Sequence, residues 1–182
     1  MQSLDMADDD LITELHDSII LRNLSTVELK RFARICEVHA YGPGERIVEQ
    51  GAVGPDLDLI LRGSVDIVLR GAEARDIVVN TVKAGDVIGE AAIFMDEPRT
   101  ASAVCRENCL VAAVSRDRLF PYCDANPKAG LKIFIYVIYS LLKRLGTTSR
   151  DLAAEKESSV TSEELDRLSK YFPKSLEDMF NK

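Results

Sequence analysis

Residues 89–101 read GEAAIFMDEPRTA, and this stretch decides how the rest of the chain is interpreted. Gly89 and Glu90 stand at the mouth of a short predicted helix, and Arg99 follows ten residues after the glycine, behind a proline. The first turn of a helix offers unpaired backbone N–H groups and a partial positive charge, which suit a phosphate. Gly89 has no Cβ, so its backbone can come close to a ligand. Arg99 can bind phosphate oxygens as a planar, two-pronged donor.

Glu90 has a different part in this pattern. A carboxylate is repelled by a phosphate, but it accepts hydrogen bonds from sugar hydroxyls. An acid for a ribose and an arginine for a phosphate, joined by a short turn, predict a nucleotide folded back on itself. The same residue types also occur at an ordinary helix start beside a surface salt bridge, so the flanking sequence has to decide between the two.

The flanking sequence favours the nucleotide. Residues 89–101 resemble the phosphate-binding cassette of the cyclic-nucleotide-binding domain family, whose pattern is Gly-Glu-x-small-apolar, a few variable residues, and then Pro-Arg-(Thr/Ala/Ser)-Ala. The resemblance continues in Glu49-Gln50-Gly51, in LILRGSV at 59–65 and in KAGDVI at 83–88. It covers roughly residues 22–150, and several motifs in order are far more specific than one glycine motif.

The resemblance implies an α+β fold, namely a β jelly-roll (a double-stranded β-helix) with flanking N-terminal helices and a long C-terminal helix. The residues themselves point the same way, because short β runs cut by glycines extend from Glu37 to Ser115, as in a sandwich or barrel. The predicted strands are Val38–Tyr41, Ile47–Gln50, Leu57–Leu61, Ser64–Leu69, Asp76–Val82, Ser102–Cys105 and Cys109–Val114.

Helical periodicity and capping signals surround these strands. Apolar spacing predicts a helix over Asp8–Leu21, and the capping box Ser25-Thr26-Val27-Glu28 starts a second helix that ends at about Ile35. A third helix is predicted from Ser115 to about Tyr122, and a long one from Pro127, a good first-turn residue, to about Glu157.

The chain therefore divides into three predicted segments. Residues 1–35 are N-terminal helices that pack on the domain, and residues 36–157 are the nucleotide-binding roll, with its cassette at 85–101 and its C-terminal helix. Residues 158–182 are a short helical tail.

The long helix carries a wide apolar stripe, which we interpret as a homodimer interface. The stripe is wider than a helix needs to cover one side of a small β domain, and the surplus would leave an exposed patch. The alternative is a core helix used entirely by its own sheet. The stripe contains Leu131, Ile133, Phe134, Tyr136, Val137, Ile138, Leu141 and Leu145.

The resemblance also assigns ligand-binding residues. From the cassette they are Gly89, Glu90, Ala91, Ala92, Arg99 and Thr100. RLGTTS at 144–149 resembles the bacterial catabolite-activator group, whose dimer helix places a Thr-Ser pair against the adenine amino group, so Thr148 and Ser149 are assigned to the base. Their alternative is a plain polar helix surface. Ile67 and Val79 are candidate apolar walls for base and sugar, or core residues that never touch ligand.

The ligand implied by the resemblance is cAMP or cGMP, as a regulatory ligand and not a cofactor. In the family an alanine or serine after the arginine often accompanies cAMP, whereas a threonine occurs in cGMP-preferring members and in channel domains that respond to cAMP. Thr100 therefore does not decide, and the pair Thr148-Ser149 favours cAMP.

Composition excludes several classes of protein. The 182 residues carry a net charge of −7, which disfavours nucleic acid, and the acidic N-terminus does not resemble a targeting segment. The longest apolar stretch, Ile133–Leu142, is too short to span a bilayer. We therefore expect a stand-alone cytoplasmic protein without a membrane partner.

The sequence predicts neither a metal site nor an enzyme. A cupin-like enzyme needs clustered histidines and carboxylates, and only His16 and His39 are present, far apart in the sequence. A second rival is an interaction protein whose pocket has lost its ligand, against which the intact Glu90 and Arg99 count. The cysteines form no C-x-x-C pair and are expected to be buried thiols: Cys36, Cys105, Cys109 and Cys123.

The last residues of the chain predict an output through an unknown protein partner. Residues 150–182 are too few for a helix-turn-helix and hold six basic and eight acidic side chains, a sum of −2. Their apolar residues are either a partner-docking surface or positions that dock on the domain itself: Leu165, Leu168, Phe172 and Phe180.

We predict that this chain alone does not bind DNA, because phosphate contacts dominate DNA affinity and no basic stripe supplies them. A mobility-shift titration at low salt with saturating cAMP should show no complex. A salt-sensitive shift at sub-micromolar protein would return the chain to the transcription-factor class.

Overall fold

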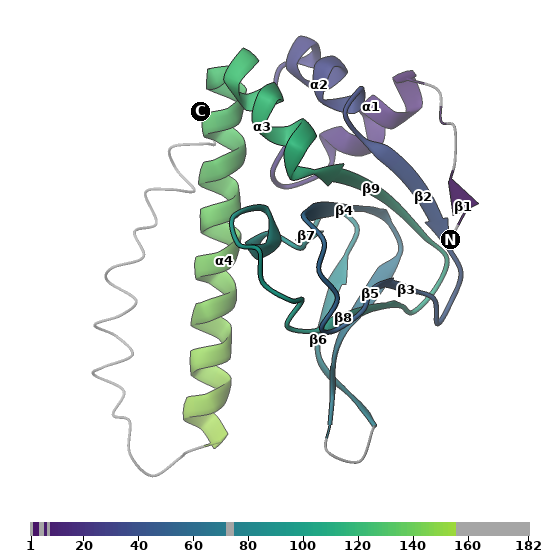
Figure 1. Cartoon of the computed structure of the whole chain (residues 1–182), viewed down its shortest axis with the longest axis vertical. Helices are drawn as coiled ribbons and strands as arrows, with labels where there is room; N and C mark the ends of the chain where they lie inside the picture. Colours follow the sequence, from purple (N-terminus) through teal and green to yellow (C-terminus); the bar gives the residue numbers. More distant parts are fainter. Residues whose placement is uncertain (1, 4–5, 7, 72–74, 156–182) are drawn as a thin grey trace. The chain divides into compact units, whose positions relative to one another are not determined.

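The described residues fall into two compact units, one within residues 1–137 and the other within residues 138–182. The first unit contains the β-roll, and the described part of the second is the C-terminal portion of a long helix (Figure 1). The predicted tail at 158–182 lies outside the described residues. The computed structural model describes residues 2–3, 6, 8–71 and 75–155.

Within the described residues, nine strands form two antiparallel sheets. One sheet has the order β1 (Gln2–Ser3), β2 (Glu37–Tyr41), β9 (Cys109–Ser115), β4 (Asp56–Arg62) and β7 (Val87–Ile88). The other has the order β3 (Arg46–Val48), β8 (Ser102–Cys105), β5 (Ser64–Arg70) and β6 (Asp76–Lys83).

The inward faces of the two sheets share one apolar core. Side chains one residue apart on a strand point to opposite faces, so alternate residues from both sheets meet inside the roll. This arrangement confirms the predicted jelly-roll. The buried members of the cluster are Tyr41, Ile60, Val65, Val82, Ile88, Ala103, Cys105, Cys109 and Val111.

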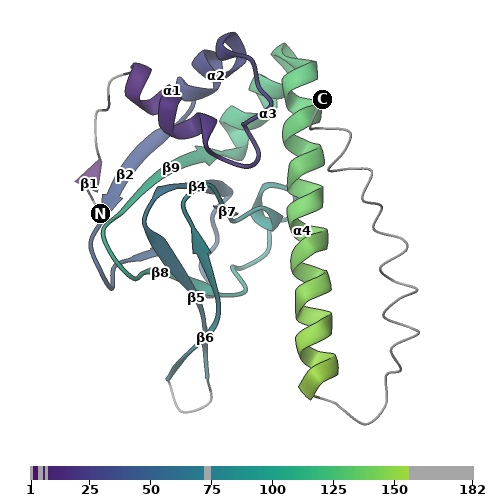
Figure 2. The same ribbon diagram turned by 180° about the vertical axis from the view of Figure 1, so that it is seen from behind.

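Three helices, α1, α2 and α3, lie beside β2 and β9, as both ribbon views show (Figures 1 and 2). Tyr122 ties two of them together, because its hydroxyl donates to the Glu28 carbonyl at 3.0 Å and its ring meets Phe32 edge-on. The helices are α1 (Asp8–His16), α2 (Thr26–Ala33), α3 (Arg116–Ala125) and α4 (Pro127–Glu155).

The predicted capping box of α2 is present. Ser25 Oγ accepts from the Glu28 N–H at 3.3 Å, and Glu28 Oε2 accepts from the Ser25 N–H at 2.7 Å. The same Glu28 oxygen lies 3.2 Å from Nζ of Lys132 on α4, so one carboxylate serves two helices.

The first helix is shorter than its periodicity predicts. α1 ends at His16, whereas apolar spacing continues to Leu21. The difference arises because the Ile19 N–H donates to the distant Gly85 carbonyl at 2.9 Å, which a continuing helix would forbid. The apolar residues after His16 are buried by turns and not by a helix.

The shortest elements carry too little pattern to be seen in the sequence. The strands β1 and β7 have two residues each and were not predicted. The helix predicted in the cassette is a single 3₁₀ turn, η1, over Ala91–Ile93. A strand of two residues has no alternation to detect, and a three-residue turn has no helical period.

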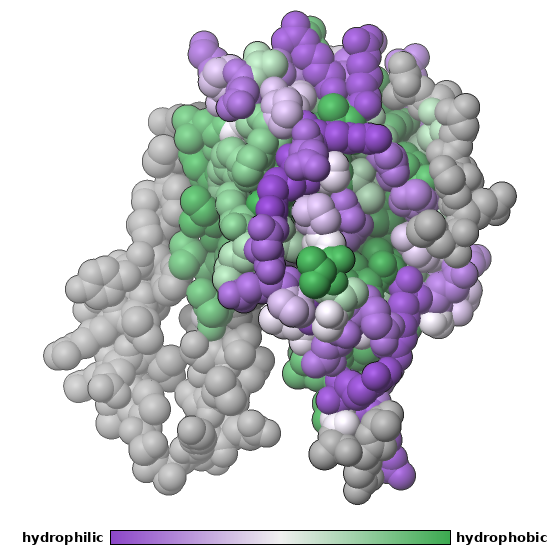
Figure 3. Space-filling view, viewed as in Figure 1, coloured by the Kyte–Doolittle hydropathy of each residue, from purple (hydrophilic) through white to green (hydrophobic). Residues whose placement is uncertain are grey.

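The helix α4 has a buried and an exposed apolar side. Ile133 and Val137 are fully buried in the first unit, and the Tyr136 hydroxyl accepts from Asn23 at 2.6 Å. Leu131 and Ile138 are 62% and 54% exposed, so only part of the predicted stripe serves the core. Figure 3 shows apolar side chains gathered over this helix.

The four cysteines are free thiols. Cys105, Cys109 and Cys123 are buried, as predicted, and Cys36 is half-buried. Burial raises the pKa of Cys105 to about 12, and a hydrogen bond with the Cys109 side chain adds to the rise. Such thiols are poor nucleophiles because the thiolate form is rare.

Candidate functional site

The backbone of Arg99 is fixed to the loop before β4. The Arg99 N–H donates to the Ala52 carbonyl at 2.8 Å, and the Gly51 N–H donates to the Arg99 carbonyl at 2.8 Å. The guanidinium then reaches the first residue of β4, where Nη2 donates to the Asp56 carbonyl at 2.8 Å. The side chain is only half-buried, so part of the cation stays accessible.

Gly89 allows this arginine to lie where it does. Its φ of 81° belongs to the left-handed region, which glycine adopts without strain. A Cβ at this position would overlap Nη1 of Arg99 and would lie 2.5 Å from the Asp56 carbonyl oxygen. The sequence predicted that Gly89 lets a ligand approach the backbone, and the structure shows a close approach by the arginine itself.

Glu90 directly follows Gly89, the residue that contacts Arg99. Its side chain is buried, because the residue is only 2% exposed, which is rare for an ionisable residue. It precedes η1 in an αR conformation and makes no capping bond with its side chain. Glu90 is thus a buried acid one residue from the glycine that Arg99 contacts, and its role toward a ribose stays a prediction.

The short turn η1 offers less than the predicted helix N-terminus. The Ala92 N–H donates to the Gly89 carbonyl at 3.0 Å, so this donor is already occupied. Ala91 is exposed and Ala92 is buried, while Thr100 is exposed beside Arg99. The half-buried Arg99 is therefore the stronger candidate for an anion-binding group than the Ala92 N–H of this turn.

The two predicted apolar walls lie in different surroundings. Ile67 on β5 is half-buried and packs against the core of the roll, whereas Val79 on β6 is 51% exposed. Ile77 and Val78, directly before Val79, are exposed as well. Of the two predicted residues, only Val79 offers a large free apolar surface.

Thr148 and Ser149 lie on α4 in the second unit, and their side chains are outside the described part of the chain. Their assignment to the base stays a prediction.

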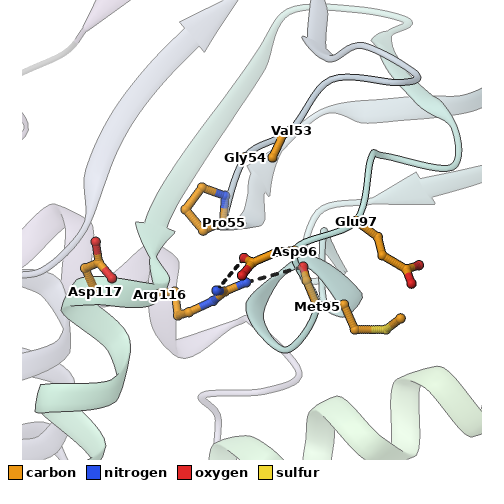
Figure 4. A pocket seen from close by; sticks show the side chains of 8 residues that line it. All are labelled: Val53, Gly54, Pro55, Met95, Asp96, Glu97, Arg116 and Asp117. Carbon is orange, nitrogen blue, oxygen red and sulfur yellow. Dashed lines mark hydrogen bonds and ion pairs between the residues drawn. The ribbon is translucent and has the colours of Figure 1, made fainter.

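Arg116 was not singled out in the sequence, yet it holds the far side of the cassette (Figure 4). Its Nη2 donates to the Ala92 carbonyl at 2.7 Å and to the Met95 carbonyl at 3.3 Å, while Nη1 pairs with Asp96 Oδ1 at 2.6 Å. Its own N–H donates to the Pro55 carbonyl at 3.0 Å. The first residue of α3 thus binds both the cassette and the loop before β4.

A small hollow of about 190 Å³ lies at this junction (Figure 4). Its lining is mostly polar and includes three acids beside the one arginine. The lining residues are Val53, Gly54, Pro55, Met95, Asp96, Glu97, Arg116 and Asp117.

Aromatic rings make a second connection from the cassette to the helices of the first unit. The rings of Phe94 and Phe134 have centroids 5.7 Å apart, and those of Phe120 and Phe134 are 6.1 Å apart. Such spacings are typical of favourable aromatic pairs. Displacement of the cassette would therefore disturb α3 and the start of α4.

Asp58 is a second buried acid near the site, and no role is predicted for it from the sequence. It stands in the apolar run of β4 and is 5% exposed. Burial raises the pKa of its carboxyl to about 7, the positive charge of Arg99 opposes this rise, and the negative charge of Asp56 adds to it. An acid inside the apolar run Leu57–Leu61 was the only signal that the sequence contained.

Comparison with known proteins agrees with this geometry. Residues 38–126 match the family described as "Cyclic nucleotide-binding domain". These residues form a cyclic nucleotide-binding domain. The chain resembles the crystal structure of a cyclic nucleotide-binding domain from Methylobacillus flagellatus KT, with 25% identity, a TM-score of 0.73 and coverage of 88% of this chain and 90% of that one.

Two relatives of known role share this domain. The chain is 26% identical to the "cAMP-activated global transcriptional regulator CRP" of Salmonella typhimurium, over 66% of this chain and 56% of the regulator. It is 31% identical to a "cAMP-dependent protein kinase regulatory subunit" of Eremothecium gossypii, over 53% of this chain and 20% of the subunit. The chain thus spans little more than half the length of the regulator and a fifth of the kinase subunit.

The described residues lack two further features. None of their helices is both long and apolar enough to cross a membrane. They also contain no group of three or more His, Cys, Asp or Glu residues placed to hold a metal ion.

We predict that Arg116→Ala lowers the free energy of unfolding by about 1–3 kcal/mol, because the carbonyls of Ala92 and Met95 lose their donor. Arg118→Ala is the matched control, since its ion pair with Glu37 is exposed and should contribute at most about 1 kcal/mol. Urea denaturation measures both variants, and hydrogen exchange should show faster exchange in residues 89–99 of Arg116→Ala alone. Equal effects of the two variants would contradict this account.

Proposed function

We propose that this chain is a cyclic-nucleotide sensor that binds cAMP, or cGMP, at its cassette and signals to a partner protein. The observation that carries the proposal is the packing of Arg99 against Gly89, one residue before the buried Glu90. The half-buried guanidinium carries further N–H donors for phosphate oxygens, and a carboxylate accepts from ribose hydroxyls.

The relatives support cAMP as the first ligand to test. One is described as cAMP-activated and the other as cAMP-dependent. Thr100 is exposed beside Arg99, and its hydroxyl can both donate and accept, so it is compatible with either base.

The contacts of the cassette support a route for the signal within the first unit. A nucleotide that binds Arg99 changes the contacts that this side chain makes with the cassette. The other side of the cassette is bound to α3 by Arg116 and to α4 by Phe94. The ligand then changes the relative populations of two arrangements of α3 and α4. The size of this change is set by the difference between the affinities of the ligand for the two arrangements.

The exposed side of α4 supports a homodimer. Its exposed leucines and isoleucine follow at steps of seven, four and three residues, the spacing of a two-helix seam. A charged residue in such a seam is costly because it is buried without a partner. The residues are Leu131, Ile138, Leu142 and Leu145.

Binding through Arg99 is tested by calorimetry with cAMP and with cGMP. Arg99→Ala should weaken binding by about 2–5 kcal/mol, because the phosphate would be buried without its cation. Arg99→Lys should recover only part of the loss, since an ammonium lacks the planar two-pronged geometry. Arg118→Ala, an arginine on the exposed surface of α3, should bind like the wild type. Equal affinities of wild type and Arg99→Ala would end the proposal.

The dimer is tested by sedimentation of Ile138→Asp, which places a charge in the exposed seam of α4. This variant should be monomeric where the wild type is dimeric. Val27→Asp is the matched control, because Val27 is also an exposed apolar residue, at 60%, but lies on α2. A wild-type monomer at high micromolar concentration, with and without nucleotide, would show the dimer proposal to be wrong.

A further inference from the structure

Asp58 occupies a position where sheets normally place apolar side chains. Its neighbours directly across the sheet are Ile88 on β7 and Ala113 on β9. Residues directly opposite each other share one face, and Ile88 belongs to the core inside the roll. Asp58 therefore points into the roll, where an ionised carboxylate is costly unless a charge or a donor compensates it.

The compensation comes from the nucleotide site itself. Ile88 is followed directly by Gly89, against which the guanidinium of Arg99 lies. Arg99 is the cation that stabilises the Asp58 carboxylate, and none of the described residues donates a hydrogen bond to that carboxylate. One positive charge thus acts on the buried Asp58 carboxyl and also belongs to the proposed phosphate site.

The other ionisable groups around Asp58 do not stabilise its carboxylate. Asp56, two residues earlier on β4, is negative and opposes ionisation of Asp58. Tyr41 faces it from β2, and burial together with the charge of Asp58 raises the pKa of this tyrosine to about 12, so it stays neutral. Within residues 89–101 the one basic side chain is Arg99, and the buried acid is Glu90.

We infer that Asp58 is a proton-binding site coupled to the nucleotide site, so that a cyclic nucleotide binds at Arg99 together with a proton on Asp58. The inference rests on the proposed function. The phosphate monoanion pairs with the positive charge of Arg99. The Asp58 carboxylate then loses the stabilisation that this charge provided, and it accepts one proton from the solvent. No other bond forms or breaks.

The direction of the pH dependence follows from the state before binding. The pKa of Asp58 in the free protein is about 7, so the carboxyl is mostly neutral at pH 6 and mostly ionised at pH 8.5. Below pH 7 the nucleotide meets a neutral carboxyl and needs no proton. Above pH 7 a proton must be acquired, so affinity falls as the pH rises.

Calorimetry with cAMP tests this coupling in two ways. The dissociation constant of the wild type should rise by about tenfold between pH 6.5 and pH 8.5. At pH 7, titrations in buffers of different ionisation enthalpy should show uptake of up to about half a proton per nucleotide, because half of the carboxyls already carry one. cAMP itself does not titrate in this range.

Three variants assign the proton to its site. Asp58→Asn should bind cAMP with an affinity independent of pH and without proton uptake. Asp124→Asn, an exposed acid on α3, and His39→Gln, an imidazole on β2, should keep the pH dependence of the wild type.

Each outcome decides one point. Binding by the wild type without proton uptake, or an Asp58→Asn variant that keeps the pH dependence, overturns the inference and leaves the proposed function standing. If Asp58→Asn does not fold, the buffer series on the wild type together with the two controls still decides. A wild type that binds no cyclic nucleotide at any pH overturns the proposed function, and the inference with it.

Discussion

The contact between the Arg99 guanidinium and the backbone of Gly89 is the constraint on which the cassette depends. A side chain at position 89 would occupy the place of the guanidinium. Without that guanidinium, the Asp56 carbonyl loses the hydrogen bond that Arg99 donates to it. The end of β7, the start of β4 and the cassette therefore meet around one positive charge.

The cassette is held on its far side by different chemistry. Arg116 binds two of its carbonyls, and the ring of Phe94 packs on Phe134. The side that carries Arg99 is governed by charge, and the side that faces the helices by backbone hydrogen bonds and ring packing. A change in charge at Arg99 can therefore alter the helices without any contact between them and the ligand.

The sequence predicted those features whose signals are local. The roll follows from short β runs, the cap of α2 from Ser25 and Glu28, and the site from the cassette motif. Arg116 and Asp58 act through partners that lie far away along the chain, and no spacing rule links them to the cassette. The early end of α1 has the same cause, since a carbonyl at Gly85 competes for its backbone. Long-range contacts of this kind become visible only in the fold.

The shared carboxylate of Glu28 has a consequence for how the protein comes apart. It closes the N-terminus of α2 and also holds Lys132 near the start of α4. If the start of α4 separates from α2, Glu28 loses Lys132 as its counter-ion at the same time as α2 loses a neighbouring helix. Unfolding of the N-terminal helices and separation of the start of α4 are thus expected to occur together, as one cooperative unit, or foldon. Glu28 and Lys132, which connect the two, are 104 residues apart in the chain.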